Sequence, residues 1–164
     1  MKNLWAPWRK DYVGGKQKTP GCFLCRSLKA SQKKDKDNYI LLRSQTAFIV
    51  LNRFPYTNGH LMVVPSRHVS TLEKLNDNES LDLLRQLDLA LDLLKKVFRP
   101  HGFNVGLNLG QMGGAGVPGH IHIHAVPRWK GDTNFMPVLT GTKVISYSLQ
   151  AVYQELKKAL QKIK

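Results

Sequence analysis

The fold is decided by the stretch Gly119-His-Ile-His-Ile-His-Ala-Val-Pro127, in which His120, His122 and His124 stand two residues apart. Side chains alternate across a strand with period two, so a strand here places the three imidazoles on one face, about 7 Å apart. Neutral imidazole titrates near pH ~6.5, so such a row can bind a metal, attack phosphorus or move protons. A ladder of purely structural histidines is the alternative. Three histidines on one face, directly after a glycine-rich loop, favour function.

Short apolar runs elsewhere in the chain predict the other strands, over 39–42, 47–51, 61–64 and 103–109. Between the second and third of these, Asn58-Gly59 is a hairpin turn signal, which indicates antiparallel pairing. The polar, lysine-rich residues 27–38 are typical of an exposed loop or a frayed helix.

Apolar residues at helical spacing predict two helices. One runs from an Asn/Asp cap near residues 76–78 to Pro100, and the other occupies residues 146–164 at the C-terminus. Strands in antiparallel order, interrupted by one long helix and closed by another, predict an α+β protein with a sheet of about five strands. We expect a single domain, 1–164, whose residues 1–20 form an N-terminal arm.

The charge balance permits an anionic partner without identifying one. The 164 residues carry 25 basic and 11 acidic side chains, a formal net charge of +14, which suits a nucleotide polyphosphate, a nucleic acid or a membrane surface. Much of the excess lies in two lysine-rich runs, 29–36 and 157–164, where charge usually serves solubility. No apolar stretch approaches the ~20 residues of a membrane span. Residues 1–9 lack the apolar core of a signal peptide, so we expect a cytoplasmic location.

The only two cysteines, Cys22 and Cys25, form a Cys-x-x-Cys pair. In a reducing compartment such a pair indicates metal ligation or redox chemistry rather than a structural disulfide. Two thiolates cannot fill the tetrahedral shell of zinc, so histidines must complete it. Outside the triad, His60, His68 and His101 are candidates, and spacing alone leaves several combinations open. A redox pair or two unligated thiols are the competing interpretations.

The glycine-rich segment Gly114-Ala-Gly-Val-Pro-Gly119 has the glycine spacing of a dinucleotide-binding loop. That loop must lead from a strand into a helix, whereas this segment contains Pro118 and leads into the histidine strand. We therefore expect its glycines, Gly116 among them, to form a turn or to let the backbone approach an anion. A neutral histidine beside such a loop could attack phosphorus and divide one hard displacement into two easier ones.

At the stretch 120–126 the chain resembles the histidine-triad (HIT) superfamily of nucleotide hydrolases and transferases. The segment Leu51-Asn-Arg-Phe-Pro-Tyr-Thr-Asn-Gly-His-Leu-Met-Val-Val-Pro65 is similar to the nucleotide-binding strand pair of that family. The segments Leu4-Trp-Ala-Pro-Trp-Arg9 and Pro127-Arg-Trp-Lys-Gly-Asp-Thr-Asn-Phe-Met-Pro137 resemble one branch, the bacterial proteins similar to diadenosine tetraphosphate phosphorylases. The resemblance implies the HIT-like fold and a homodimer with the sheets of the two subunits side by side.

The resemblance also implies a role for each candidate residue. It implies that His122 is the nucleophile, that His124 contacts the phosphate chain, and that His60 supports this network. It places Asn52 against the nucleoside. Either Asn108 or Gln111, at the start of the glycine-rich loop that includes Gly116, would contact the α-phosphate or ribose. The zinc ligands it implies are Cys22, Cys25, His68 and His120.

The function that follows is a HIT-family nucleotidyltransferase or hydrolase acting on phosphoanhydrides of adenine nucleotides. The most specific form is phosphorolysis of diadenosine tetraphosphate to ADP and ATP, with inorganic phosphate as acceptor, structural zinc and no organic cofactor. One alternative is a hydrolase that releases AMP from dinucleoside polyphosphates or nucleoside phosphoramidates. The alternative from another class is a zinc-stabilised nucleic-acid-binding module using Trp5, Trp8 and Trp129 to stack bases. Nucleic acid is not the partner we expect, nor is a membrane.

Overall fold

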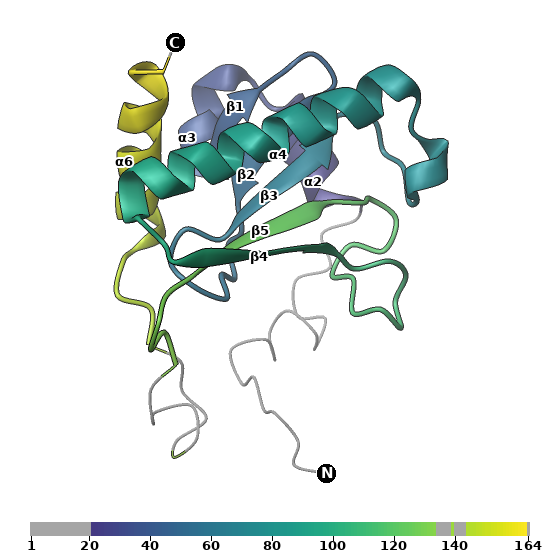
Figure 1. Cartoon of the computed structure of the whole chain (residues 1–164). Helices are drawn as coiled ribbons and strands as arrows, with labels where there is room; N and C mark the ends of the chain where they lie inside the picture. Colours follow the sequence, from purple (N-terminus) through teal and green to yellow (C-terminus); the bar gives the residue numbers. More distant parts are fainter. Residues whose placement is uncertain (1–20, 134–138, 140–143, 164) are drawn as a thin grey trace.

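Five antiparallel strands form one sheet in the order β1-β2-β3-β5-β4 (Figure 1). The structure is a computed structural model that describes residues 21–133, 139 and 144–163. The strands are β1 Ile40–Arg43, β2 Ala47–Leu51, β3 Leu61–Pro65, β4 Gly102–Leu107 and β5 Ile123–Arg128. The helices are α2 Phe23–Lys29, α3 Asp35–Asn38, α4 Asp77–Phe98 and α6 Leu149–Gln161, with 3-10 turns η2 Gln32–Lys34 and η3 Leu72–Lys74. The predicted α+β class and five-stranded sheet are confirmed.

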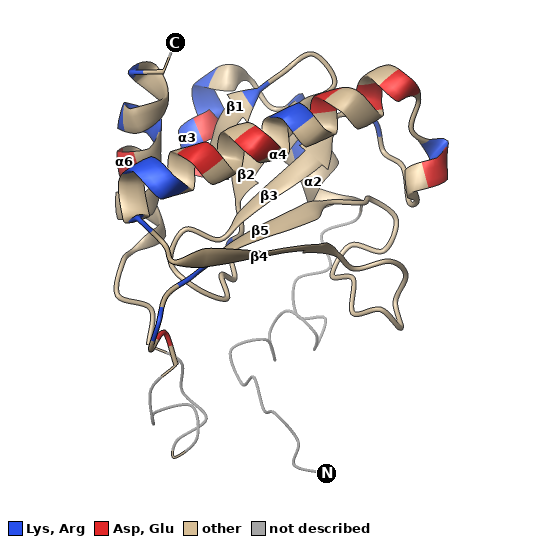
Figure 2. Cartoon of the chain, in the orientation of Figure 1, with Lys and Arg blue, Asp and Glu red and all other residues tan. Residues whose placement is uncertain are grey.

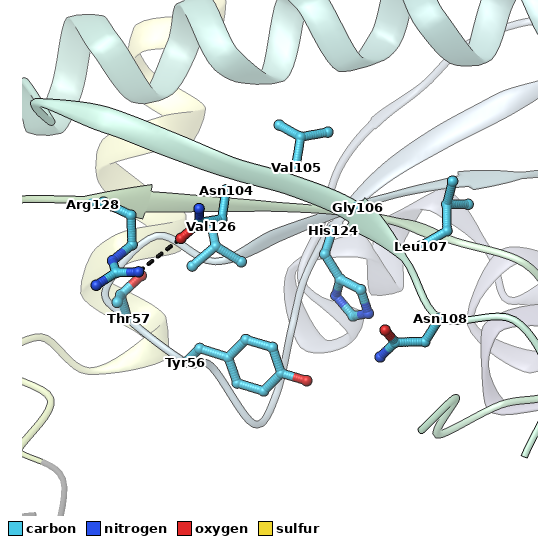
Figure 3. Close-up of a pocket in the computed structure, with 10 residues that line it drawn as sticks. All are labelled: Tyr56, Thr57, Asn104, Val105, Gly106, Leu107, Asn108, His124, Val126 and Arg128. Carbon is cyan, nitrogen blue, oxygen red and sulfur yellow. Dashed lines mark hydrogen bonds between the residues drawn. The ribbon is translucent and has the colours of Figure 1, made fainter. Parts of the chain in front are cut away.

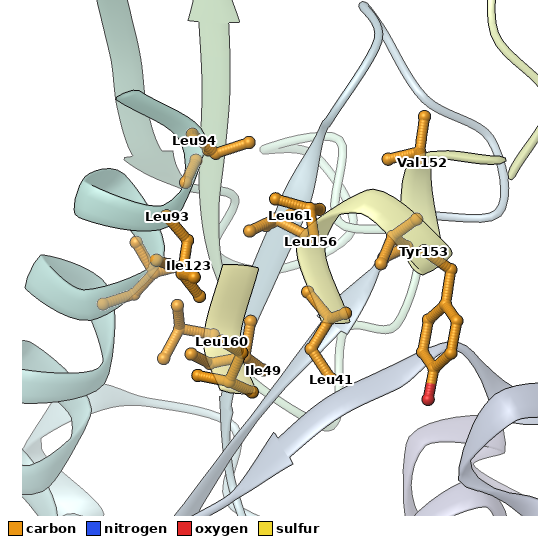
Figure 4. Close-up of a cluster of buried hydrophobic side chains, with 14 of the residues drawn as sticks. Leu41, Ile49, Leu61, Leu93, Leu94, Ile123, Val152, Tyr153, Leu156 and Leu160 are labelled. Carbon is orange, nitrogen blue, oxygen red and sulfur yellow. The ribbon is translucent and has the colours of Figure 1, made fainter. Parts of the chain in front are cut away.

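One face of the sheet is covered by α4 and α6. Alternate residues of the strands, such as Ile49 and Ile123, point to this face because side chains alternate along a strand. They meet Leu93 of α4 and Leu156 of α6 in the main core (Figure 4). Each of these four side chains is at most 5% exposed. Burial on this scale stabilises the domain by roughly 1.5–3 kcal/mol for each large aliphatic side chain.

The opposite face is covered by α2 only over β1, β2 and β3. There Leu24 packs on the other alternate set of strand residues, which includes Phe48, Val50 and Met62. A pocket lies on the β5–β4 end of the same face, and His124 and Val126 are among the residues that line it. The two faces therefore differ in use, because one holds the core and the other leaves room for a ligand at its β4–β5 end.

The long helix α4 begins where the sequence predicted it. The Asn76 side chain accepts a hydrogen bond from the Glu79 backbone N–H, and the Glu79 carboxylate accepts one from the Asn76 N–H, so the two residues form a capping box. The helix ends with Arg99 in the left-handed conformation, directly before Pro100. The Ser148 side chain accepts a hydrogen bond from the Ala151 N–H and caps α6. This helix therefore starts at Leu149 rather than at residue 146.

The predicted histidine strand is wrong at its start. Strand β5 begins at Ile123, and only His124 of the three histidines lies in it. The ladder to β3 ends at the Val63–Ile123 pair, because Pro65 has no N–H to continue it. The Ile121 N–H instead donates to the Val69 carbonyl.

The remaining predictions about individual segments differ in how well they match the structure. The lysine-rich residues 27–38, expected to be a loop or frayed helix, form the end of α2, then η2 and the single turn of α3. The strand expected over 103–109 is β4 and ends at Leu107. The predicted arm 1–20 and residues 134–137 of the segment 127–137 lie outside the described residues. Within the described residues, no helix combines the length and apolar character needed to cross a membrane.

The cap of α4 also makes an ion pair that predicts how stability depends on pH. Arg67 donates to both carboxylate oxygens of Glu79, at 2.8 and 2.6 Å. This contact, followed by the hydrogen bond from the Asn76 backbone, lowers the pKa of Glu79 from 4.5 to about 2. A carboxylate with a lowered pKa stabilises the fold above its unfolded pKa, and the stabilisation is lost as the pH falls through the folded pKa. We therefore expect the free energy of unfolding to decline between pH 4.5 and about 2.

Replacing Arg67 by Met should lower the free energy of unfolding at neutral pH and flatten that decline. Urea titrations at a series of pH values measure both effects. Lys96→Met is the matched control, because Lys96 pairs with Asp92 on the exposed face of α4 and such pairs contribute about 0.5 kcal/mol. Equal pH dependence in the wild type and Arg67→Met would show that this ion pair does not cause the acid sensitivity.

Candidate active site and metal centre

One ring nitrogen of His122 takes part in a hydrogen bond to the backbone, and the other presents a lone pair. Its Nδ1 lies 2.9 Å from the backbone oxygen of His120. A carbonyl oxygen can only accept, so Nδ1 carries the proton and Nε2 presents its lone pair. Within the described part of the chain, Nε2 has no hydrogen-bond partner and is not among the buried unpaired atoms. Burial lowers the pKa of His122, which favours the neutral ring.

His124 has the opposite tautomer, and a chain of hydrogen bonds fixes it. The backbone N–H of Tyr56 donates to Nδ1 of His60 at 3.1 Å, so the proton of neutral His60 is on Nε2. That Nε2 lies 2.9 Å from Nδ1 of His124 and donates to it. The proton of neutral His124 is therefore on Nε2, where it can serve as a donor. The two neighbouring histidines thus present a lone pair and a proton, with ring centroids 4.8 Å apart.

Asn52 acts within this network and is not among the residues that line the pocket. Its side-chain oxygen accepts a hydrogen bond from the Phe54 N–H at 2.9 Å, and its amide nitrogen lies 3.4 Å from Nδ1 of His60. The structure therefore places Asn52 behind His60, at the end of β2. A direct contact with a nucleoside stays a prediction.

A pocket of about 370 Å³ opens beside His124, on the sheet face away from α4 (Figure 3). Its floor consists of alternate residues of two strands, because residues two apart in a strand share a face. The lining residues are Tyr56, Thr57, Asn104, Val105, Gly106, Leu107, Asn108, His124, Val126 and Arg128. Its volume is within the range of small-molecule sites, about 300–1,000 Å³.

The glycine-rich loop contributes less to the pocket than the sequence suggested. Asn108 lines it and donates to the Gly114 carbonyl at 3.4 Å, while Gln111 and Gly116 are exposed and outside the lining. Sequence reasoning missed the far end of the pocket, which Asn104 and Arg128 form. The period-two rule could have found both, since Asn104 precedes Asn108 by four strand residues and Arg128 follows His124 by four.

A second cluster brings together the two cysteines and two histidines. Cys22 Sγ lies 3.3 Å from Nδ1 of His120, and Cys25 Sγ lies 3.3 Å from Nδ1 of His68 and 3.4 Å from Nδ1 of His120. The four ligand atoms lie within 4.8 Å of one another. Zinc bonds of about 2.0–2.3 Å require tetrahedral edges of about 3.3–3.8 Å between ligand atoms, so this donor set fits the ion.

Only one of the three candidate histidines outside the triad joins this cluster. His60 is bonded to His124, and His101 accepts a hydrogen bond from the Lys130 N–H at the start of β4. His68 follows β3 and lies in van der Waals range of Gly119, where an added Cβ would come within 3.2 Å of its ring nitrogen. The structure thereby selects one combination from those that spacing left open.

His120 connects the cluster to the histidine pair. Its Nε2 donates to the Pro65 carbonyl at 2.9 Å, which leaves the Nδ1 lone pair facing the thiols. Its own backbone oxygen accepts from Nδ1 of His122. Burial raises the pKa of the Cys25 thiol, as does its hydrogen bond with Cys22. A bound cation acts in the opposite direction and favours the thiolate.

Arg43 of β1 anchors the short helix that carries Cys25. Its guanidinium donates to the carbonyls of Ser27, Leu28 and Ala30 at the C-terminal end of α2 and pairs with Asp35. The sheet therefore fixes the cysteine pair through a half-buried cation as well as through Leu24. Elsewhere the surface charges are mixed, since acidic side chains accompany lysines and arginines along α4 (Figure 2).

Comparisons with known proteins show which family and fold this chain shares. The HIT domain family model matches residues 33–131. The AP-4-A phosphorylase of Mycobacterium tuberculosis is 41% identical over 155 residues, which cover 92% of this chain and 80% of that protein. The asymmetrical bis(5'-nucleosyl)-tetraphosphatase of Schizosaccharomyces pombe is 32% identical over 93 residues, 57% of this chain and 50% of that protein. A crystal structure of a Zn-bound histidine triad family protein from Mycobacterium smegmatis superposes with a TM-score of 0.68 at 19% identity, covering 87% of this chain and 95% of that one, and shows a shared fold.

Proposed function

The chain belongs to the HIT domain family, and from this membership we propose that it transfers a nucleotidyl group from a dinucleoside polyphosphate through a covalent intermediate on His122. The observation that carries the proposal is the pair of opposite tautomers, a lone pair on His122 Nε2 beside a proton on His124 Nε2. Nucleophilic substitution at phosphorus uses both, one to attack and one to stabilise the charge on the departing oxygen through a hydrogen bond.

In the first step, Nε2 of His122 forms a bond to the phosphorus of an adenylyl group, and the bond from that phosphorus to the bridging oxygen breaks. The departing polyphosphate accepts a hydrogen bond from His124 Nε2, which keeps its proton because a neutral imidazole N–H is too weak an acid to release it to a phosphate oxygen. His60 holds the His124 ring in this donor orientation through their 2.9 Å hydrogen bond. The His120 carbonyl, which accepts from Nδ1 of His122, stabilises the positive charge that the attacking ring acquires.

In the second step, an oxygen of the acceptor forms a bond to the same phosphorus, and the phosphorus–nitrogen bond to His122 breaks. Any proton on the attacking oxygen passes to solvent, and His122 regains its Nε2 lone pair. Inorganic phosphate as acceptor gives ADP, and water gives AMP. We favour phosphate and diadenosine tetraphosphate, with ADP and ATP as products, because the 41% identical relative is named AP-4-A phosphorylase.

Cys22, Cys25, His68 and His120 would hold zinc in this reading. Four protein ligands leave no position for water, so the ion would supply structural stability rather than chemistry. A cysteine pair that ligates a metal instead of forming a disulfide suits a reducing compartment, which supports a cytoplasmic location. The β4 edge, where Asn104, Val105 and Gly106 are exposed, is where we place the second subunit of a homodimer.

Product analysis tests the acceptor. With diadenosine tetraphosphate and phosphate we expect ADP and ATP in equal amounts, and without phosphate we expect turnover to fall at least tenfold. Radiolabelled phosphate should appear in ADP and not in ATP, because the acceptor joins the adenylyl group that His122 carried. AMP and ATP formed at the same rate with and without phosphate would instead identify a hydrolase.

A further inference from the structure

The pocket floor has an unusual composition on the β4 side. The residues of β4 and its extension that face the pocket are Asn104, Gly106 and Asn108, two amides with no side chain between them (Figure 3). Gly106 pairs directly with His124 across the ladder. The space that a side chain would fill therefore lies beside the histidine that donates a hydrogen bond to the departing oxygen.

Among the residues that the structure describes, nothing requires glycine at this position. Its φ is not in the left-handed region, and an added Cβ would meet no atom within 4 Å. Glycine in a strand interior weakens the strand, because it has no side chain to pack and loses more entropy on folding. The missing side chain therefore serves the pocket, where it leaves open the passage between His124 and the far end.

The far end of that passage presents a flat, fixed guanidinium. Arg128 donates to both carboxylate oxygens of Asp132, and its Nη1 donates to the side-chain oxygen of Asn104 at 2.7 Å. Asp132 offsets the charge, and the contacts on three nitrogens hold the group in one plane. Such a plane suits stacking of a heterocyclic ring. The amide nitrogen of Asn104 remains as a donor for a ring or hydroxyl acceptor.

The pocket also lies on a defined side of the reacting phosphorus. The nucleophile is His122, and the departing oxygen must be near His124, which lines the pocket while His122 does not. His124 and Arg128 are four positions apart in β5, which corresponds to about 13 Å along the strand. The passage therefore has room for several phosphates before the guanidinium is reached.

We propose that this β4–β5 pocket binds the half of a dinucleoside polyphosphate that is released in the first step, with Gly106 open for the polyphosphate and Arg128 and Asn104 against the second nucleoside. The proposal rests on the proposed function, because it names the site of that substrate's second half. It predicts that a side chain at position 106 discriminates between substrates with and without a second nucleoside.

Binding measured without turnover tests this separately from catalysis. In a His122→Ala background, calorimetry gives the affinities for diadenosine tetraphosphate and for AMP, before and after Gly106→Val. We expect the dinucleotide affinity to fall at least tenfold and the AMP affinity to change less than threefold. Gly102→Val is the matched control, the same substitution in β4 at a glycine that also has open space and does not line the pocket. It should leave the ratio of the two affinities unchanged.

Asn104→Ala should reduce the ratio of the diadenosine tetraphosphate affinity to the AMP affinity without narrowing the passage. Equal losses for both ligands in Gly106→Val, or no loss for either, would overturn the proposal. Failure of the proposed function looks different, since the wild type would then turn over no dinucleotide while the affinity pattern persisted. Circular dichroism and thermal unfolding of each variant confirm the fold, which valine in a strand should stabilise if anything.

Discussion

Replacing His122 by Ala should abolish turnover, with kcat reduced about 10⁴-fold or more. The variant loses the Nε2 lone pair that attacks phosphorus, and His124 cannot substitute because its Nε2 carries a proton fixed by His60. The remaining activity would come from binding alone. Zinc content and the melting temperature should change little, because His122 contacts the metal cluster only through the His120 carbonyl. Steady-state kinetics, metal analysis and thermal unfolding measure the three quantities.

The covalent intermediate gives a second readout. With phosphate withheld, rapid quenching of the wild type should trap one nucleotidyl group on the peptide that contains His122, and the variant should show none. His101→Ala is the matched control, an exposed histidine outside both sites. It should retain activity. Turnover of diadenosine tetraphosphate at an undiminished rate in His122→Ala would refute the mechanism.

The substitution His124→Ala separates the roles of the two histidines. Without the hydrogen bond from His124, the charge on a departing phosphate oxygen is not stabilised and departure is slow, whereas p-nitrophenolate delocalises its charge over the ring. The p-nitrophenyl ester of AMP should therefore restore much of the rate of His124→Ala and none of the rate of His122→Ala. Equal behaviour of both variants toward this ester would contradict the assignment of a donor and a nucleophile.

Local sequence rules predicted most of the fold because the elements are locally consistent. Asn76 and Glu79 form a capping box, and alternating apolar residues of β2 and β3 fill the two faces of the sheet. The start of β5 was mispredicted because alternation describes side chains and not hydrogen-bond partners. The missing N–H of Pro65 on the neighbouring strand ends the ladder before His122.

The site was predictable in its residues and not in its geometry. Spacing placed three histidines together, but opposite tautomers on His122 and His124 depend on the Tyr56 backbone and the His120 carbonyl, which no sequence pattern encodes. The Cys/His cluster joins Cys22 to His120, about 100 positions apart, so sequence spacing could not show which histidines meet the cysteines. Arg128 was missed because a strand arginine is normally a solvated surface residue.

Loss of the metal should have the largest effect on stability. We expect purified wild-type protein to hold one zinc per chain and Cys25→Ser to hold none, because Cys25 Sγ contacts both ligand histidines. With free zinc 1,000-fold above its dissociation constant, binding stabilises the fold by about 4 kcal/mol, so its loss should lower the melting temperature by about 10 °C. A chelator should lower the wild-type melting temperature to that of Cys25→Ser and should leave the variant unaffected.

Two histidines supply the matched comparison for the same experiment. His68 and His101 are both exposed, but only His68 has a ring nitrogen in the cluster. His68→Ala should lose zinc and stability, while His101→Ala keeps both. Gly119→Ala should be intermediate, because its Cβ would displace the His68 ring. The zinc assignment would be refuted if the purified protein contained no metal and a chelator left its melting temperature unchanged. Cys22 and Cys25 would then be unligated thiols, and the hydrogen bond of His120 to the Pro65 carbonyl would be its only contact that orients His122.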